Sequence, residues 1–203
     1  MKNFGLVVIG AHFGVWLENE LTKFENKNIL LVEPVPYNYK ILINNYADKK
    51  NIHICTNVIF SENKKGKFYY VKEDSIHKLK KHWASGIGSI DKKHILNHKN
   101  KRFNIQEEDI SELEVDFITF NDLIKKYEIN SIQKLQIDVE GAEYKILNEM
   151  NFKKIEIRSI QFESKHFDGT FNEGSNLDEI KKKLITNGYK IKQIDKENIL
   201  AEK

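Results

Sequence analysis

Short apolar runs that end in glycine or in an acid recur along the chain. Gly5–Ile9 is continuously apolar, the pattern of a strand buried on both faces, and runs through Gly10-Ala-His-Phe-Gly14 into helical spacing. Asn28–Glu33 repeats the strand pattern, and so does Leu135–Ile137, which stops at Asp138 before another helical pattern. Strands that alternate with helices in this way predict an α/β fold with a mostly parallel sheet.

Further elements extend this pattern. A third strand is predicted over Ile52–Thr56, and two runs, Asn57–Ser61 and Lys67–Val71, flank turn residues and predict a β-hairpin extension. Glu114–Thr119 predicts a strand, followed by a helix over Asn121–Tyr127 that Asn121 caps.

The last third of the chain continues the alternation. Arg158–Glu163 predicts a strand, and a helix follows, capped by Ser175 or Asn176 and ended by Asn187-Gly188. Tyr189–Ile194 and Asn198–Ala201 then predict a closing antiparallel hairpin.

Candidate chemistry gathers where the strands end. In open α/β sheets ligands bind at the carboxyl ends of the strands, so Asp138, Glu140 and Glu143 would crowd that edge, with Gly141 allowing a sharp turn. The alternative is that Asp138 and Glu140 only cap the following helix and favour its positive end. Glu33, about 20 residues beyond the glycine turn, is placed to accept the hydroxyls of a ribose.

The glycine turn is less specific by itself. Its glycines stand four apart, whereas a dinucleotide turn needs Gly-x-Gly-x-x-Gly, which disfavours a nicotinamide-dependent oxidoreductase. Alone it could be a tight turn and nothing more. A glycine turn combined with an acid at the end of the next strand favours a nucleotide site.

The segment 74–109 is polar and predicts an irregular insertion. It carries four histidines, of which His94 and His98 stand at i, i+4, but no carboxylate follows them in a zinc-protease pattern, so no metal is expected. Within it, Trp83-Ala-Ser-Gly-Ile-Gly-Ser89 predicts a flexible loop suited to closing over a site, with an ordinary surface loop as the alternative.

Length and composition limit the number of domains and the class of protein. The 203 residues suit a single domain, 1–203, and 40% hydrophobic with 31% charged residues suits a globular protein. A net charge of +3 is too small to indicate a nucleic-acid partner. With one cysteine, Cys55, no apolar run near 18 residues and no signal peptide, a cytoplasmic protein without a membrane span is expected. Oligomeric state is not indicated.

These motifs resemble a known family. Leu135-Gln-Ile-Asp-Val-Glu-Gly-Ala-Glu-Tyr144 closely resembles the signature of the FkbM-type methyltransferases, Gly10–Gly14 their first motif and Glu33-Pro-Val-Pro-Tyr-Asn38 their second. The resemblance implies a three-layer, Rossmann-like class I methyltransferase sheet, mostly parallel with an antiparallel last strand, and segment 74–109 as an acceptor-side loop insertion. Val8 departs from the pattern, because the family usually has an acid there, and His12 replaces the usual Asn.

The resemblance also implies the chemistry. The cofactor would be S-adenosyl-L-methionine, with binding residues Gly10, Ala11, His12, Gly14, Glu33, Asn57, Val58 and Asp138. The acceptor would be a small-molecule or glycan hydroxyl, most naturally on a sugar or small metabolite.

Proton removal would fall to one of four residues near the strand ends: Asp138, Glu140, Glu163 or His166. His166 has the most suitable ordinary pKa, although it could equally be a solvated loop residue. The Val8 and His12 departures keep open an alternative, a catalytically degenerate relative that binds a nucleoside ligand or a protein partner.

Overall fold

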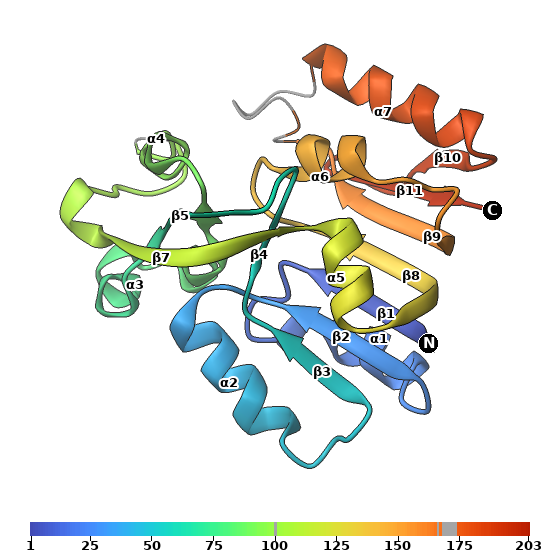
Figure 1. Cartoon of the computed structure of the whole chain (residues 1–203). Coiled ribbons are helices and arrows are strands. Elements are labelled where there is room, and N and C mark those ends of the chain that lie inside the picture. Colours follow the sequence, from blue (N-terminus) through green and yellow to red (C-terminus); the bar gives the residue numbers. More distant parts are fainter. Residues whose placement is uncertain (100, 166, 168–173) are drawn as a thin grey trace.

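A seven-stranded sheet forms the centre of the computed structural model, which describes residues 1–99, 101–165, 167 and 174–203 (Figure 1). The strand order is β10-β11-β9-β8-β1-β2-β3. The strands span β1 Lys2–Ile9, β2 Asn28–Val32, β3 Ile52–Cys55, β8 Ile129–Ile137, β9 Glu156–Glu163, β10 Lys190–Gln193 and β11 Asn198–Glu202. Neighbours from β3 to β9 are parallel, whereas β11 runs antiparallel to both β9 and β10. This confirms the predicted mostly parallel sheet with its antiparallel final strand.

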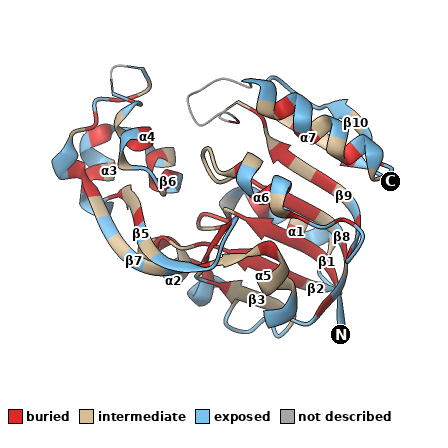
Figure 2. Ribbon diagram, turned by 45° about the horizontal axis from the view of Figure 1, so that its top comes forward, coloured by how far each residue is buried: buried red, intermediate tan, exposed pale blue. Residues whose placement is uncertain are grey.

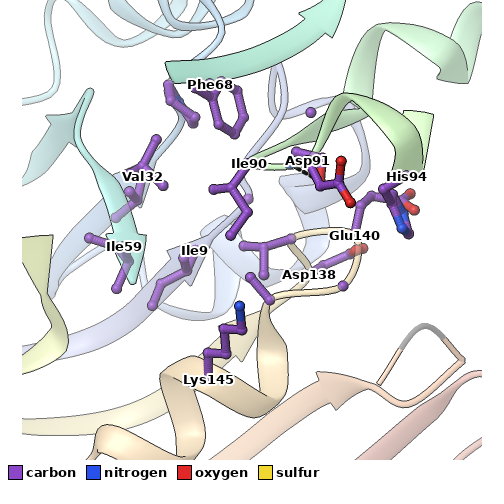
Figure 3. Close-up of a pocket in the computed structure, with 18 of the residues that line it drawn as sticks. Ile9, Val32, Ile59, Phe68, Ile90, Asp91, His94, Asp138, Glu140 and Lys145 are labelled. Atoms are coloured by element: carbon purple, nitrogen blue, oxygen red, sulfur yellow. Dashed lines mark hydrogen bonds between the residues drawn. The ribbon is translucent and has the colours of Figure 1, made fainter. Parts of the chain in front are cut away.

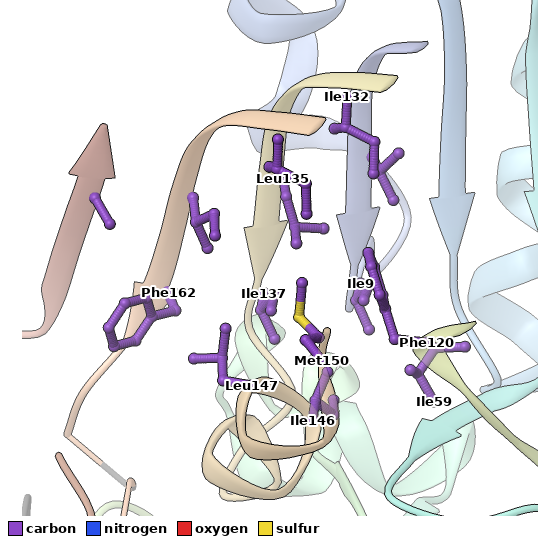
Figure 4. Close-up of a cluster of buried hydrophobic side chains, with 14 of the residues drawn as sticks. Ile9, Ile59, Phe120, Ile132, Leu135, Ile137, Ile146, Leu147, Met150 and Phe162 are labelled. Atoms are coloured by element: carbon purple, nitrogen blue, oxygen red, sulfur yellow. The ribbon is translucent and has the colours of Figure 1, made fainter. Parts of the chain in front are cut away.

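The central strand is buried on both faces because its apolar residues are continuous. Val7 and Ile9 point into one hydrophobic cluster, and Leu6 and Val8 into another on the opposite face. Figure 4 shows the first cluster, where Ile9 packs with residues of the neighbouring strands and of two helices. Each fully buried Ile or Leu stabilises the fold by roughly 1.5–3 kcal/mol relative to an exposed one.

Helices cover both faces and complete the three layers (Figure 2). On one face lie the 3₁₀ helix η1 Val15–Leu17, α1 Glu18–Lys23 and α2 Pro36–Tyr46. On the other lie α5 Phe120–Lys126, α6 Glu143–Glu149 and α7 Gly174–Thr186. The cap of α5 differs from the prediction, because the Thr119 side chain accepts from Asp122 N, whereas Asn121 lies inside the helix and donates to Glu149.

A second sheet of four strands stands beside the first. It comprises β4 Val58–Phe60, β5 Lys64–Val71, β6 Gly88–Ser89 and β7 Ile110–Thr119, in the order β4-β7-β5-β6. Both strands of the predicted hairpin extension form, but their predicted pairing is wrong. The later strand β7 lies between them, parallel to β4 and antiparallel to β5.

The inserted segment is more regular than the sequence predicted. It contains α3 Glu73–Leu79, η2 His82–Gly86, α4 Lys92–Leu96 and η3 Glu107–Asp109. Its apolar residues form a separate small core that includes Leu79, Ile87, Ile95, Phe103 and Ile105. These residues are scattered without period among lysines, so only the tertiary fold brings them together. In the described part of the chain, the helices are too short or too polar to cross a membrane.

Candidate active site

The glycine turn after β1 is held against the end of β8. Asp138 N donates to Ile9 O at 2.9 Å, and Gly10 adopts a positive φ of 89°. A Cβ atom at Gly10 would lie 1.7 Å from the carbonyl oxygen of Asp138, well inside contact distance. Glycine is therefore required here by the close approach of two backbones.

Glu33 stands at the end of β2 and organises the same edge. Its two carboxylate oxygens accept from His12 N and from Val35 N, each at 2.8 Å, and the residue is only 4% exposed. Burial raises the pKa of Glu33 to about 7, against the opposing effect of these amide donors. The Asn38 side chain is a third donor to this carboxylate, which leaves room for a further donor such as a ribose hydroxyl.

His12 connects the glycine turn to the insertion. Its Nε2 lies 2.6 Å from Ser85 Oγ, and that hydroxyl itself donates to the His82 carbonyl at 2.7 Å, so His12 is the donor in the first bond. Burial, and then the neighbouring His82, lower the pKa of His12 to about 4, which keeps the ring neutral. Gly14 faces Leu42 and Tyr46 of α2 instead of a ligand space.

The loop from β8 to α6 is a sharp turn that Glu143 stabilises. Glu140 and Gly141 both have positive φ, 55° and 105°. The Glu143 carboxylate accepts from Val139 N at 2.7 Å and from Gly141 N at 2.9 Å. The N-cap residue of α6 is Ala142, which makes no side-chain cap bond, and the acid that bonds the loop amides is Glu143, in the first turn of the helix.

Three carboxylates meet at the ends of β8 and β9. Asp138, Glu143 and Glu163 can each place an oxygen within 4.8 Å of the other two. Burial and then repulsion between the acids raise the pKa of Asp138 to about 8 and that of Glu163 to about 10. Burial also raises the pKa of Glu143 to about 7, although the two loop amides counteract it. The cluster therefore retains protons at neutral pH.

A cavity of about 310 Å³ opens between this edge and the insertion (Figure 3). Six of the predicted site residues line it: Gly10, Glu33, Asn57, Val58, Asp138 and Glu140. Among the described residues, Ala11, His12, Gly14 and Glu163 are not part of its lining, and His166 lies outside the described residues. Ile9, Val32, Ile59 and Phe68 form an apolar side, whereas Asp91, His94 and Glu140 lie at the other side.

Several lining residues were missed by sequence reasoning: Phe68, Ile90, Asp91, His94, Tyr144 and Lys145. Lys145 reaches the cavity from α6 (Figure 3), and its helical position carries no sequence signal for that role. Asp91 caps α4 by accepting from Lys93 N at 2.8 Å. Aspartate is a common N-cap residue, so its place directly before a helix could have been predicted from the sequence.

Comparison with known proteins identifies the family. Residues 9–191 match the model of the methyltransferase FkbM domain, so the chain belongs to this family. The predicted family is therefore confirmed, and the description of the matched domain as a methyltransferase agrees with the predicted enzyme class. No protein of curated function matches the sequence.

The solved structures that match the chain are distant from it in sequence. A Methanococcus jannaschii fibrillarin, described as a pre-rRNA processing protein, is 11% identical, with 99% of this chain and 66% of that one covered and a TM-score of 0.47. An Aeropyrum pernix fibrillarin with natively bound S-adenosyl-L-methionine is 11% identical, covered over 98% and 66%, with a TM-score of 0.46. A precorrin-6y C5,15-methyltransferase from Geobacter metallireducens is 9% identical, covered over 100% and 82%, with a TM-score of 0.48. The chain spans just under two thirds of the two fibrillarins.

Proposed function

We propose that the chain transfers the methyl group of S-adenosylmethionine to a hydroxyl of a sugar or another small metabolite. The observation that carries this proposal is the meeting of three adjacent strand ends at one cavity. Gly10, Glu33 and Asp138 follow β1, β2 and β8, which are neighbours in the sheet, and all three line that cavity. Ligands of open α/β sheets bind at this kind of edge.

The cofactor would lie across these strand ends. Glu33 would accept the ribose hydroxyls, and Asn57 and Val58, which follow β3, would flank the adenine on the apolar side of the cavity. Gly10 lets the end of β1 lie close to the Asp138 carbonyl, so that both strand ends would border the cofactor. Asp138 is protonated at neutral pH in the ligand-free protein. It would lie near the sulfonium, whose positive charge would lower the pKa of this carboxyl and favour its ionised form.

Methyl transfer from a sulfonium is an in-line displacement. The acceptor oxygen forms a bond to the methyl carbon as the carbon–sulfur bond breaks, and S-adenosylhomocysteine leaves as a neutral thioether. The hydroxyl proton must pass to a base. Asp138 has the most direct position and would accept the proton in its ionised form, which the adjacent sulfonium would favour, while Glu140, Glu163 and His166 remain the other candidates.

The insertion would form the acceptor side of the site. Ile90, Asp91 and His94 line the wall of the cavity that faces the strand ends. They offer one apolar and two polar side chains, which suits a small hydroxylated molecule better than an extended apolar one.

Two departures from the family pattern favour the alternative, a relative that binds a nucleoside without transferring methyl. Val8 occupies the position where the family usually has an acid, and its side chain lies in an apolar cluster on the face of α1 and α2. His12, in the place of the usual Asn, is engaged by Ser85.

Calorimetric titration of the folded protein with S-adenosylmethionine and with S-adenosylhomocysteine tests the proposal. We expect both to bind, and we expect a screen of hydroxylated acceptors with a labelled methyl donor to yield a labelled product. Binding without transfer to any acceptor class would favour the alternative, and a folded protein that binds neither ligand would contradict the cofactor assignment.

A further inference from the structure

Two histidines that the sequence presents as part of a polar loop are buried. His94 is 4% exposed and His98 is completely buried. His94 lies in α4, and the turn continues beyond the helix because Asn97 N donates to Lys93 O and His98 N to Ile95 O. The two imidazole rings therefore lie on one side of the turn, with centroids 5.7 Å apart and planes at 78°.

A carboxylate from another part of the chain joins them. Glu140 belongs to the loop after β8, where its positive φ of 55° and the following Gly141 produce a sharp turn. Such left-handed backbone is costly for a residue other than glycine and is concentrated at functional sites. Glu140, His94 and His98 can each offer one ligand atom within 4.8 Å of the other two.

We propose that His94, His98 and Glu140 bind a divalent transition-metal ion, with zinc the best match, and that this ion holds the acceptor hydroxyl. Two imidazoles and one carboxylate are a ligand set of catalytic zinc sites, which keep a further position open. Calcium and magnesium prefer sites made of oxygen ligands. Ligand atoms in a tetrahedral zinc site lie roughly 3.4 Å apart, so small side-chain rotations suffice to close the set around an ion.

The position of the cluster gives the ion its role, which rests on the proposed function. His94 and Glu140 line the same cavity as Asp138, and Figure 3 shows them together at its polar side. An acceptor oxygen bound at the open position would lose its proton more readily, because the ion stabilises the developing negative charge. The ion would also join α4 of the insertion to the loop after β8.

Zinc binding to the whole, metal-stripped protein tests the site directly. Calorimetric titration with zinc chloride should show one equivalent bound. His94→Ala and Glu140→Gln should weaken this binding at least 100-fold, and Glu140→Gln retains the shape of the side chain if truncation disturbs folding. The matched control is His77→Ala, which removes an exposed histidine of the same insertion and should bind zinc as wild type does.

Two results would overturn the site: no stoichiometric zinc binding by the folded wild type, or unchanged binding in both ligand variants. Titrating the same metal-free samples with S-adenosylhomocysteine separates this inference from the proposed function. If S-adenosylhomocysteine binds and zinc does not, the metal site alone is overturned. If zinc binds and S-adenosylhomocysteine does not, the cofactor assignment is overturned and the metal site is supported. Methyl transfer that falls at least tenfold with a chelator and returns with zinc supports the acceptor role; transfer unaffected by the chelator overturns it.

Discussion

Glu33 illustrates how one side chain serves both structure and recognition. Its oxygens hold two backbone amides, and the same carboxylate borders the cavity. The hydrogen bonds from these amides fix the orientation of the carboxylate before any ligand binds, which lowers the entropy cost of binding.

We expect Glu33→Ala to weaken the binding of S-adenosylhomocysteine by about 1–3 kcal/mol, because charge-assisted hydrogen bonds to the ribose are lost. The variant should also unfold at lower urea concentration, since His12 N and Val35 N lose their buried acceptor. Calorimetry measures the first effect and circular dichroism the second. Glu25→Ala, at an exposed position before β2, is the control, and an unchanged affinity in folded Glu33→Ala would refute the ribose assignment.

Asp138 should matter more for turnover than for folding. We expect Asp138→Asn to reduce the rate of methyl transfer by roughly 10²–10⁴, the usual contribution of a general base. Its stability at neutral pH should not fall, because Asn has nearly the same shape as the protonated carboxyl that it replaces. Steady-state rates and urea unfolding measure the two effects, with the exposed Asp48→Asn as control. Wild-type turnover in Asp138→Asn would remove this residue from the reaction.

Single residues that end an apolar run were the most predictable part of the site. Gly10, Glu33 and Asp138 were identified because each follows a strand, and parallel strands bring their carboxyl ends to one edge. Glu140 joining His94 and His98 could not be foreseen, because that meeting depends on how the insertion folds over the sheet. Lys145 also lacked a signal, since nothing in its sequence context distinguishes it from other surface lysines.

At the scale of elements, the close approach of β1 and β8 depends on Gly10. We expect Gly10→Ala to destabilise the protein by at least the roughly 1–3 kcal/mol of left-handed strain, and further by displacing the Asp138 carbonyl. Gly188→Ala is a matched control, because Gly188 has nearly the same φ, 88°, and nothing lies near its added Cβ. Urea unfolding of both variants isolates the steric part, and equal losses would contradict the close contact.

The carboxylates at the ends of β8 and β9 should make stability depend on pH. Unfolded carboxyl groups ionise near pH 4, whereas the folded-state pKa values are raised to about 7, 8 and 10. Between these limits the folded state binds more protons, so the free energy of unfolding falls as pH rises, by at most about 1.4 kcal/mol per pH unit for each proton. His12 acts in the opposite direction only below about pH 6.5, because its folded pKa is lowered to about 4.

Urea unfolding of the metal-free protein between pH 6.5 and 8 measures this slope. We expect Glu163→Gln to flatten it and to raise stability at the upper end, whereas Glu156→Gln, exposed at the start of the same strand, should reproduce the wild-type slope. A wild-type slope in Glu163→Gln would show that Glu163 is not protonated in the folded state.

Pairing between elements was predicted well only where it was local or repeated. The parallel order of the main sheet follows from alternating strands and helices, and the closing hairpin joins neighbours in sequence. The partner of β4 and β5 is β7, which lies about 40–50 residues further along, and no local pattern marks that partnership. The core of the insertion could not be predicted for a related reason, since Leu79, Ile95 and Phe103 follow no helical or strand period.

At the scale of the whole molecule, one cavity lies between two differently built parts. The strand ends supply Gly10, Glu33 and Asp138, and the insertion supplies Ile90 and Asp91. A ligand that fills the cavity contacts both parts and must leave before they can separate.

We therefore expect S-adenosylhomocysteine to slow amide hydrogen exchange in both parts, over residues 86–94 as well as 137–141. At a ligand concentration about 100 times Kd, exchange that requires the cavity to open should slow about 100-fold. Residues 195–197, in the hairpin at the far edge of the sheet, should exchange at an unchanged rate. Protection confined to the strand ends would show that the insertion does not enclose the bound ligand.

The insertion has its own apolar core, centred on Leu79, Ile87 and Ile95, separate from the core under β1 and β8. Because the two apolar cores are separate, mutations within one core, away from the His12–Ser85 contact that joins the walls, leave the packing of the other core intact. A lineage with this architecture can therefore drift toward new methyl acceptors while its donor site stays the same.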